Sequence, residues 1–329
     1  MSSPLGQLSL LSKEVRAVWL SYQSPTLVHT LPLSDALPDR EPDANGATVA
    51  SGSTSIPIDQ ITHRFESLEQ TRNALQRTEE VLRAADDRRS VFLTIYVEMT
   101  KAVIQEIETE AFHDPAWARK YLIEFANWYR EALLNFEQGN MQDIPQPWQL
   151  AFSASMSGHT LVIQDLLLGV NAHINYDLAY TLTEIDIDPN RSKKLRDHNQ
   201  INRILASLID TAQSIISERY STAGLAEVDV SLGRFDEWFT LFSLTETRDL
   251  AWKNAKSLTD SQWGLHRRYT EWKISTFATG AAYFVLAPSA DRSTLWHLRN
   301  VEGTAPVVDQ LSTEFRQRSG DVEVLTRRR

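Results

Sequence analysis

The stretch from Leu161 to Leu182, LVIQDLLLGVNAHINYDLAYTL, constrains the fold of this chain more than any other. At about 100° per residue on a helical wheel, its leucines, isoleucines and valines point in almost every direction. A helix that is apolar all round normally occupies the centre of a bundle and not its surface. We therefore expect an all-α fold, a single-domain multi-helix bundle around a buried central helix at about residues 161–185.

The same stretch carries polar side chains that a buried helix must accommodate. Gln164, Asn171 and Asn175 fall within one narrow arc of the wheel, whereas His173 and Asp177 lie nearly opposite. Inside a protein, an unpaired polar group costs about 1–3 kcal/mol. Such a set is retained either as a fully satisfied hydrogen-bond network or for chemistry. We therefore select His173, Asp177, Asn171 and Asn175 as candidate catalytic residues.

The i, i+4 spacing of His173 and Asp177 is compatible with three interpretations. The carboxylate can orient the ring of a general base. Both side chains can instead bind one metal ion, and this spacing recurs in helical phosphoesterases built on zinc. The third interpretation is structural: a buried histidine bonds to the aspartate one turn on and holds two helices in register.

Other predicted helices supply candidate substrate-binding residues. One helix is expected over 90–110, and a second starts at Asp114 and Pro115 and is dense in aromatic residues, a pattern that more often marks a core than a binding wall. A third, over 192–220, would bring Asp197 near His173 if it packs antiparallel to the central helix. The candidates, including one from the central helix, are Tyr96, Asn127, Trp128, Gln164, Asp197 and Asn202.

An aspartate pair just before the helix expected over 90–110 invites comparison with the Asp-rich magnesium motif of terpene cyclases. Two arginines follow it directly in Asp86-Asp87-Arg88-Arg89. We therefore interpret this segment as a solvated helix cap or a salt bridge. Gly-rich phosphate loops, Gly-x-Ser-x-Gly elbows and His-Glu-x-x-His patterns are absent from the sequence.

The composition favours a helical protein and excludes several functional classes. The 329 residues include only 12 Gly and 12 Pro, and 42% are hydrophobic. A formal charge of −10 argues against nucleic acid as a partner, because a phosphate backbone requires a basic surface. The absence of cysteine excludes disulfides, thiolate nucleophiles and cysteine-based metal sites. These features fit a reducing, cytoplasmic setting.

Three segments of different character follow one another along the chain. Residues 1–23 include an amphipathic stretch that predicts an N-terminal helix, and residues 24–55 are rich in Pro, Asp, Ser and Ala, which is typical of a flexible linker or surface loop. We assign residues 56–329 to the helical catalytic domain. The N-terminus lacks a signal-peptide pattern, and no apolar run is long enough for a transmembrane span.

Several runs resemble a known family. They are VFLTIYVEMT, HDPAW, FANWY, LLLGVNAHINYDL and DHNQIN, of which the run around Gly169 to Leu178 is the most specific. Together they resemble domain of unknown function 5995, a family found largely in actinobacteria and also in fungi. The resemblance covers about Ile58 to Leu258, and the region after Leu258 looks peculiar to this chain. It implies an all-helical fold and a shared set of Asn171, His173, Asn175 and Asp177, but no established activity.

Three hypotheses for the function remain. The first, which we prefer, is a lyase, cyclase or isomerase of secondary metabolism that acts on a hydrophobic small molecule in an aromatic-lined pocket and needs no cofactor. The second is a hydrolase that depends on a divalent metal ion, with His173 and Asp177 as ligands and Asp197 or His198 completing the site. The third is a non-catalytic helical binding protein. The aromatic content and the lack of a dense histidine array favour the first. The sequence indicates neither the substrate nor the oligomeric state.

Overall fold

The computed structural model describes residues 58–222, 244–261, 263–286, 298–300, 302 and 307–326. Within these ranges every regular element is helical and no strand occurs, so the all-α prediction is confirmed. The expected helix over 1–23 and linker over 24–55 lie outside the described residues. The elements are η1 Ile58–Gln60, α5 Leu68–Ala84, α6 Ser90–Glu108, α7 Pro115–Glu137, η2 Met141–Asp143, α8 Gln146–Ser157, α9 Val162–Asn171, η3 Ala172–Asp177, α10 Leu178–Glu184, α11 Arg191–Thr222, α13 Leu244–Asp260, α14 Gly264–Leu286 and α16 Val307–Thr326.

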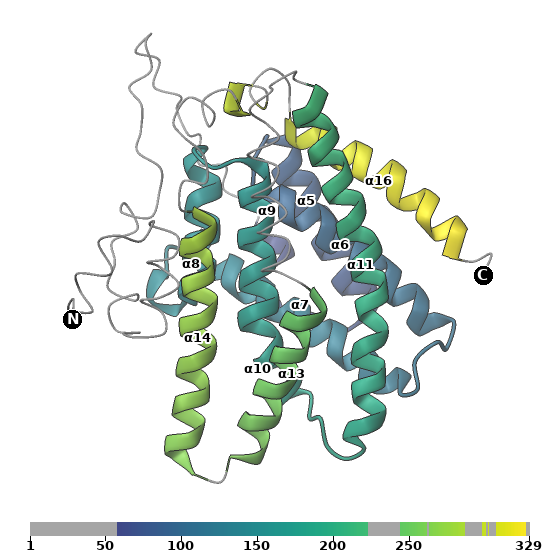
Figure 1. Cartoon of the computed structure of the whole chain (residues 1–329), viewed down its shortest axis with the longest axis vertical. Coiled ribbons are helices and arrows are strands. Elements are labelled where there is room, and N and C mark those ends of the chain that lie inside the picture. The colour runs from purple at the N-terminus through teal and green to yellow at the C-terminus, as the bar shows by residue number, and fades with distance from the viewer. Residues whose placement is uncertain are drawn as a thin grey trace, which may run out of the picture.

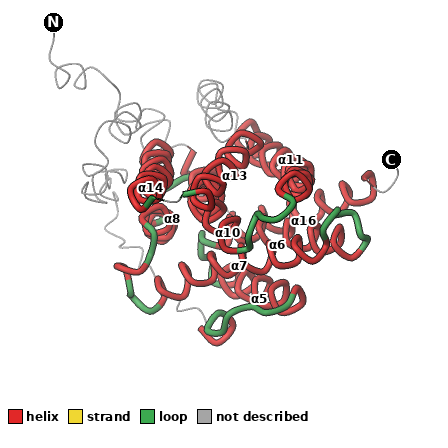
Figure 2. Tube along the Cα trace, turned by 90° about the horizontal axis from the view of Figure 1, so that it is seen from below, coloured by secondary structure: helices red, strands yellow, loops and turns green. Residues whose placement is uncertain are grey.

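The predicted central helix is the axis of the bundle. α9, η3 and α10 follow one another without a break, and every residue of α9 is buried. Figure 1 shows α9 in the middle of the molecule, with α8 and α14 on one side and α11 on the other. In the end-on view of Figure 2, the other helices surround α10. The apolar circumference of this segment is thus explained by neighbours on all sides.

The central helix is not a regular α-helix along its whole length. Residues Ala172–Asp177 form a turn of π-helix, in which the backbone hydrogen bonds widen to the i→i+5 spacing. Such turns are rare and occur frequently at functional sites. The sequence did not indicate this turn, and it contains both His173 and Asp177.

Local signals in the sequence set several helix ends. Ser67 accepts a hydrogen bond from the backbone N of Gln70 and caps α5. Asp114 accepts from the backbone N of Trp117 at 3.1 Å and caps α7, whose first residue is Pro115, as predicted. α8 ends at Gly158, which adopts a left-handed backbone conformation with φ of 66° that glycine tolerates without strain.

Salt bridges hold the turn between α5 and α6. The salt bridge predicted for residues 86–89 is therefore confirmed, whereas the arginine that forms it is buried and not solvated. Arg89 is buried, and its guanidinium binds the carboxylates of Asp87 and Glu137. The neighbouring Arg88 donates from Nε to Oδ2 of Asp165 at 2.6 Å, which ties this turn to the central helix. Paired charges of this kind are what allow arginine to be buried.

Within the described ranges, none of the helices combines the length and the hydropathy that crossing a bilayer requires.

Candidate functional site

The candidate site is built on the π-helical turn of the central helix. Nδ1 of His173 lies 2.8 Å from Oδ2 of Asp177. The indole Nε1 of Trp148, on α8, donates to the same carboxyl oxygen at 2.9 Å. All three side chains are buried, with His173 only 2% exposed. We call His173 and Asp177 the dyad.

Aromatic rings from three helices enclose the dyad. The ring of Phe125 lies flat on the imidazole, with centroids 3.6 Å apart and planes at 12°. Tyr96 meets the imidazole edge-on, with centroids 4.5 Å apart. Three further rings have centroids 5.9 to 6.2 Å from that of His173. Together these five rings form the aromatic enclosure, which consists of Phe92, Tyr96, Phe125, Tyr129 and Trp148.

Burial controls the protonation of the dyad. It lowers the pKa of His173 well below 6.5, because the imidazolium loses its hydration. It also raises the pKa of Asp177 well above 3.8, although the hydrogen bond from Trp148 acts in the opposite direction. Both shifts favour the uncharged forms. We therefore assign the dyad a neutral imidazole and a protonated carboxyl, with one proton shared between Nδ1 and Oδ2.

The dyad retains two polar atoms without a hydrogen bond to any described residue. They are Nε2 of His173 and Oδ1 of Asp177. The hydroxyl of Tyr129, in the enclosure, also has no hydrogen bond to a described residue. An unsatisfied buried polar atom costs about 1–3 kcal/mol, and native proteins contain few of them. A ligand or a water molecule inside the enclosure would satisfy these atoms.

The structure separates the asparagines of the central helix from the dyad. Asn175 donates from Nδ2 to Oδ1 of Asn171 at 2.9 Å, and Asn171 donates to the backbone oxygen of Ala278 on α14 at 2.8 Å. Gln164 bonds to the same helix through the backbone oxygen of Val285 at 2.7 Å. These three amides therefore connect the central helix to α14, on a different side from the rings that enclose His173.

Four other candidate substrate-binding residues form contacts within the fold. Asn127 bonds through its amide to both the backbone N and the backbone O of Phe65, at 2.8 and 3.0 Å. Trp128 stacks on Tyr180 and donates to Glu184. On α11, Asp197 accepts hydrogen bonds from backbone N atoms before α7, and Asn202 accepts one from Arg248. Of the six residues, Tyr96 is the one whose ring contacts the dyad.

A second buried cluster surrounds Arg248, which is 1% exposed. Arg248 donates to the backbone oxygen of His198 at 2.9 Å, to the hydroxyl of Tyr121 at 3.3 Å, and from Nε to Oδ1 of Asn202. The Tyr121 hydroxyl lies 2.9 Å from Nδ1 of His198. Burial, followed by the charge of Arg248, lowers the pKa of His198 well below 6.5. This ring is therefore neutral and is committed to the cluster.

The ligand set of the metal hypothesis is not assembled. Asp197 accepts hydrogen bonds from the backbone N atoms of His113 and Asp114, at 2.8 and 2.7 Å, and His198 belongs to the cluster around Arg248. Among the residues that the structure describes, no group of three or more His, Cys, Asp or Glu side chains is arranged to hold a metal ion. The expectation that Asp197 or His198 joins His173 and Asp177 is wrong.

α7 connects the two buried clusters. Four of its aromatic residues, at positions 117, 121, 125 and 129, recur at every fourth position, which places them along one side of the helix. Tyr121 reaches His198, while Phe125 and Tyr129 reach His173. This spacing is visible in the sequence and could have identified Phe125 as a neighbour of the central helix. No comparable signal identified Trp148 as the partner of Asp177.

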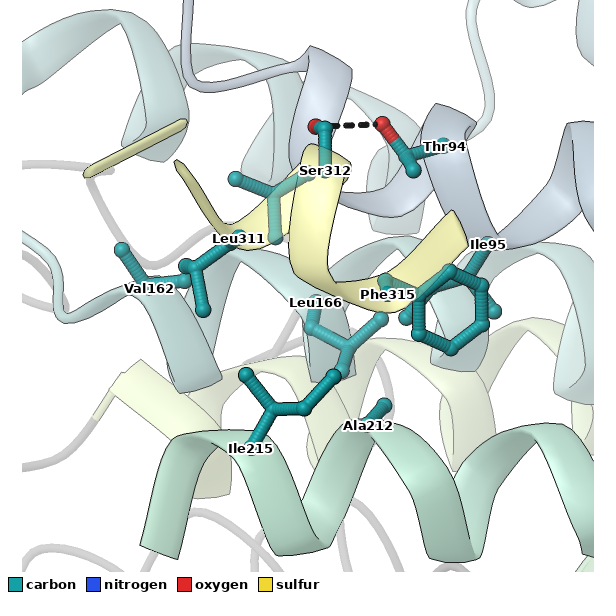
Figure 3. Close-up of a pocket in the computed structure, with 10 residues that line it drawn as sticks. Thr94, Ile95, Val162, Leu166, Ala212, Ile215, Leu311, Ser312 and Phe315 are labelled. Atoms are coloured by element: carbon teal, nitrogen blue, oxygen red, sulfur yellow. Dashed lines mark hydrogen bonds between the residues drawn. The ribbon is translucent and has the colours of Figure 1, made fainter. Parts of the chain in front are cut away.

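An apolar cavity of about 30 Å³ lies further along the central helix. It is bounded by α6, α9, α11 and α16, and Figure 3 shows Phe315 of α16 beside Ile95 and Leu166. A cavity of this size holds about one water molecule, and an apolar one stays dry. His173 is not among the residues that line it.

Comparison with known proteins gives one match. The profile of a family of unknown function, DUF5995, matches residues 68–288. The chain belongs to this family. The match includes the dyad, the aromatic enclosure and the cluster around Arg248, whereas α16 lies outside it. It also extends through α14, so the expectation that the region after Leu258 is peculiar to this chain is wrong for residues 259–288. No curated protein and no solved structure matches the chain.

We expect Phe125→Ala to cost about 3–5 kcal/mol of unfolding free energy and to leave a void beside His173. Because apolar voids bind small apolar ligands, benzene should raise the melting temperature of this variant and not that of the wild type. Phe136→Ala, on the same helix but packed on Phe152, is the matched control. Equal responses of the two variants to benzene would contradict a ligand-sized space beside the imidazole.

Proposed function

We propose that this protein is an enzyme of secondary metabolism that moves a proton within a hydrophobic small molecule, as an isomerase, cyclase or lyase. The observation that carries the proposal is the dyad. A histidine and an aspartate are held together deep in an aromatic enclosure, and each retains a polar atom with no partner among the described residues. A purely structural pair would be expected to satisfy these atoms.

The dyad has the chemistry for both halves of a proton shift. When Nδ1–H donates to Oδ2, Nε2 of His173 has a free lone pair and the carboxyl proton resides on Oδ1 of Asp177. Nε2 takes a proton from one atom of the substrate while Oδ1 gives one to another, so the substrate keeps its mass. The dyad is then an imidazolium and a carboxylate. Transfer of the Nδ1 proton to Oδ2 gives an uncharged pair in the opposite tautomer. After the product leaves, loss of the Nε2 proton to water, return of the Oδ2 proton to Nδ1 and uptake of a proton at Oδ1 restore the starting form.

The surroundings of the dyad support this role. The hydrogen bond from Trp148 stabilises the carboxylate at the stage at which it is ionised. The rings of the enclosure offer apolar contact, and their faces attract positive charge that develops in a substrate during cyclisation. Because Phe125 covers one face of the imidazole, this side chain must move when a substrate binds. General acid–base groups of this kind contribute about 10²- to 10⁴-fold to a rate.

The test compares the wild type with His173→Gln and Asp177→Asn, both first shown to be folded by circular dichroism. Each protein is incubated with a small-molecule extract of the source organism, and the mixture is followed by mass spectrometry. We expect the wild type to convert a compound to a product of unchanged mass, or, for a lyase, to two products whose masses add up to that of the substrate. Both variants should do so at least about 100-fold more slowly.

Conversion at equal rates by all three proteins would contradict the role of the dyad. Wild-type protein that converts nothing, yet is stabilised by apolar compounds, would move the assignment to a binding protein. Elemental analysis accompanies the assay, and a stoichiometric metal lost in both variants would restore the hydrolase hypothesis.

A further inference from the structure

The turn between α13 and α14 gathers exposed apolar side chains. Among the described residues, the large hydrophobic side chains that are exposed are Trp263 at 75%, Leu265 at 79%, Tyr269 at 58% and Met141 at 37%. The first three lie between positions 263 and 269. Figure 1 shows that α13 and α14 run side by side to this turn, which lies at the lower extremity of the molecule. Exposure of this kind has no role in stabilising the fold and marks a contact surface.

Basic residues are interleaved with these apolar side chains. Arg267 and Arg268 lie between Leu265 and Tyr269, and both are exposed. The carboxylates near this end are already engaged, since Glu271 binds Arg267 and Asp260 binds Arg191. Within the described ranges, Arg268 forms no ion pair. In the described part of this turn, Arg268 is therefore the cation that is free to meet an anionic partner, whereas Arg267 is already in an exposed pair with Glu271. The chain as a whole has a formal charge of −10.

The shape and chemistry of the turn fit a lipid surface better than a protein. A stable protein interface buries about 800 Å² on each partner, which the apex of a single helical hairpin does not offer. Tryptophan and tyrosine are enriched where membranes meet water, because their rings are apolar and their tips are polar. Arginine binds the phosphates of anionic lipids. The same turn thus carries apolar rings that can insert into a bilayer and arginine that can pair with lipid phosphates.

We propose that the α13–α14 turn is a peripheral membrane contact. Trp263 and Leu265 insert among the headgroups of an anionic bilayer, and Tyr269 lies at the level of the headgroups. Arg268 binds a lipid phosphate, and Arg267 exchanges its exposed pair with Glu271 for a second phosphate. The acidic remainder of the protein is repelled by the same surface, so the charge distribution orients the molecule with this turn towards the membrane. The proposal is independent of the chemistry of the dyad.

The experiment is flotation of the full chain with vesicles of phosphatidylcholine alone or with phosphatidylserine added. We expect binding to the vesicles that contain phosphatidylserine, and loss of at least ten-fold in affinity for the Trp263→Ser/Leu265→Ser double variant. The Arg267→Gln/Arg268→Gln variant should lose most of the dependence on phosphatidylserine and on salt. Met141→Ser changes the remaining exposed hydrophobic side chain and is expected to bind as the wild type does.

Wild-type protein that does not float with phosphatidylserine vesicles would overturn the proposal, as would undiminished binding of the Trp263→Ser/Leu265→Ser variant. All variants alter exposed side chains, and an unchanged melting temperature verifies that they are folded. Sedimentation velocity distinguishes membrane binding from self-association through this turn. Self-association that is abolished in the Trp263→Ser/Leu265→Ser variant, without vesicle binding, would assign the turn to contacts between copies of the chain and overturn the membrane assignment.

Discussion

Replacing Gly169 by alanine is expected to destabilise the protein by about 3 kcal/mol or more, at the upper end of the range for overpacking. A Cβ at this position would lie 2.4 Å from Cγ and 2.6 Å from Cβ of Phe92. Neither atom is the mobile end of a side chain, and the ring of Phe92 is held among Tyr96, Tyr129 and Trp148. At a solvent-exposed position of a helix, Gly→Ala would raise the unfolding free energy by about 1 kcal/mol. At Gly169 the clash with Phe92 reverses the sign of this change.

Chemical denaturation of Gly169→Ala measures this cost, and two further variants interpret it. Gly264→Ala is the control, because a Cβ there meets nothing within 4 Å and should change the unfolding free energy by less than about 1 kcal/mol. Combining Gly169→Ala with Phe92→Leu should lose less than the sum of the two single changes, since removal of the ring relieves the clash. Gly169→Ala with wild-type stability would contradict the close approach of α6 and α9.

Asp165→Ala is expected to cost about 3–5 kcal/mol of unfolding free energy, because it leaves a mostly buried guanidinium without its nearest carboxylate. Asp165 accepts from Nε of Arg88 at 2.6 Å and from the hydroxyls of Ser155, at 3.1 Å, and Thr160. Arg88 retains Glu302 at 3.2 Å as its second carboxylate. Because Glu302 still neutralises the Arg88 guanidinium, we expect the loss of unfolding free energy to stay within this range.

Urea unfolding of three variants tests this assignment. Asp165→Leu/Arg88→Met/Glu302→Gln removes all three buried charges and should recover a substantial part of the loss, because Glu302 would otherwise remain as a buried carboxylate that has lost its arginine. Glu271→Gln, in the exposed pair with Arg267, should change the unfolding free energy by less than about 1 kcal/mol. A triple variant less stable than Asp165→Ala would show that the lost hydrogen bonds from Ser155 and Thr160, and not the stranded charge of Arg88, dominate.

The elements that sequence reasoning predicted correctly are those determined within a single segment. The apolar circumference of 161–182 requires neighbours on all sides whichever helices provide them, so the central position of α9 and α10 followed directly. Asp114 and Pro115 begin α7 because an exposed helix end needs an acceptor and tolerates a missing N–H. The contact between His173 and Asp177 also follows from spacing along one helix.

The errors concern which helices meet. Asp197 would approach His173 if α11 packed antiparallel to the central helix in the required register. Instead, it accepts hydrogen bonds from the backbone N–H groups of His113 and Asp114, just before α7. His198 follows Asp197 in the chain yet points to Tyr121 and Arg248. Neighbouring residues on a helix face different directions, so the partner of each depended on the placement of α7 and α13.

The sequence by itself determined that this protein is all-helical, which segment is buried at its centre, and that a histidine and an aspartate meet on that segment, because helix periodicity and i, i+4 spacing are local properties. Only the tertiary structure decided what surrounds them. Phe92, Phe125 and Trp148 come from three different helices, and their convergence on His173 depends on interhelical packing, including the close approach that Gly169 permits. Contacts between distant segments arise from the joint packing of all helices, which no single stretch of residues encodes.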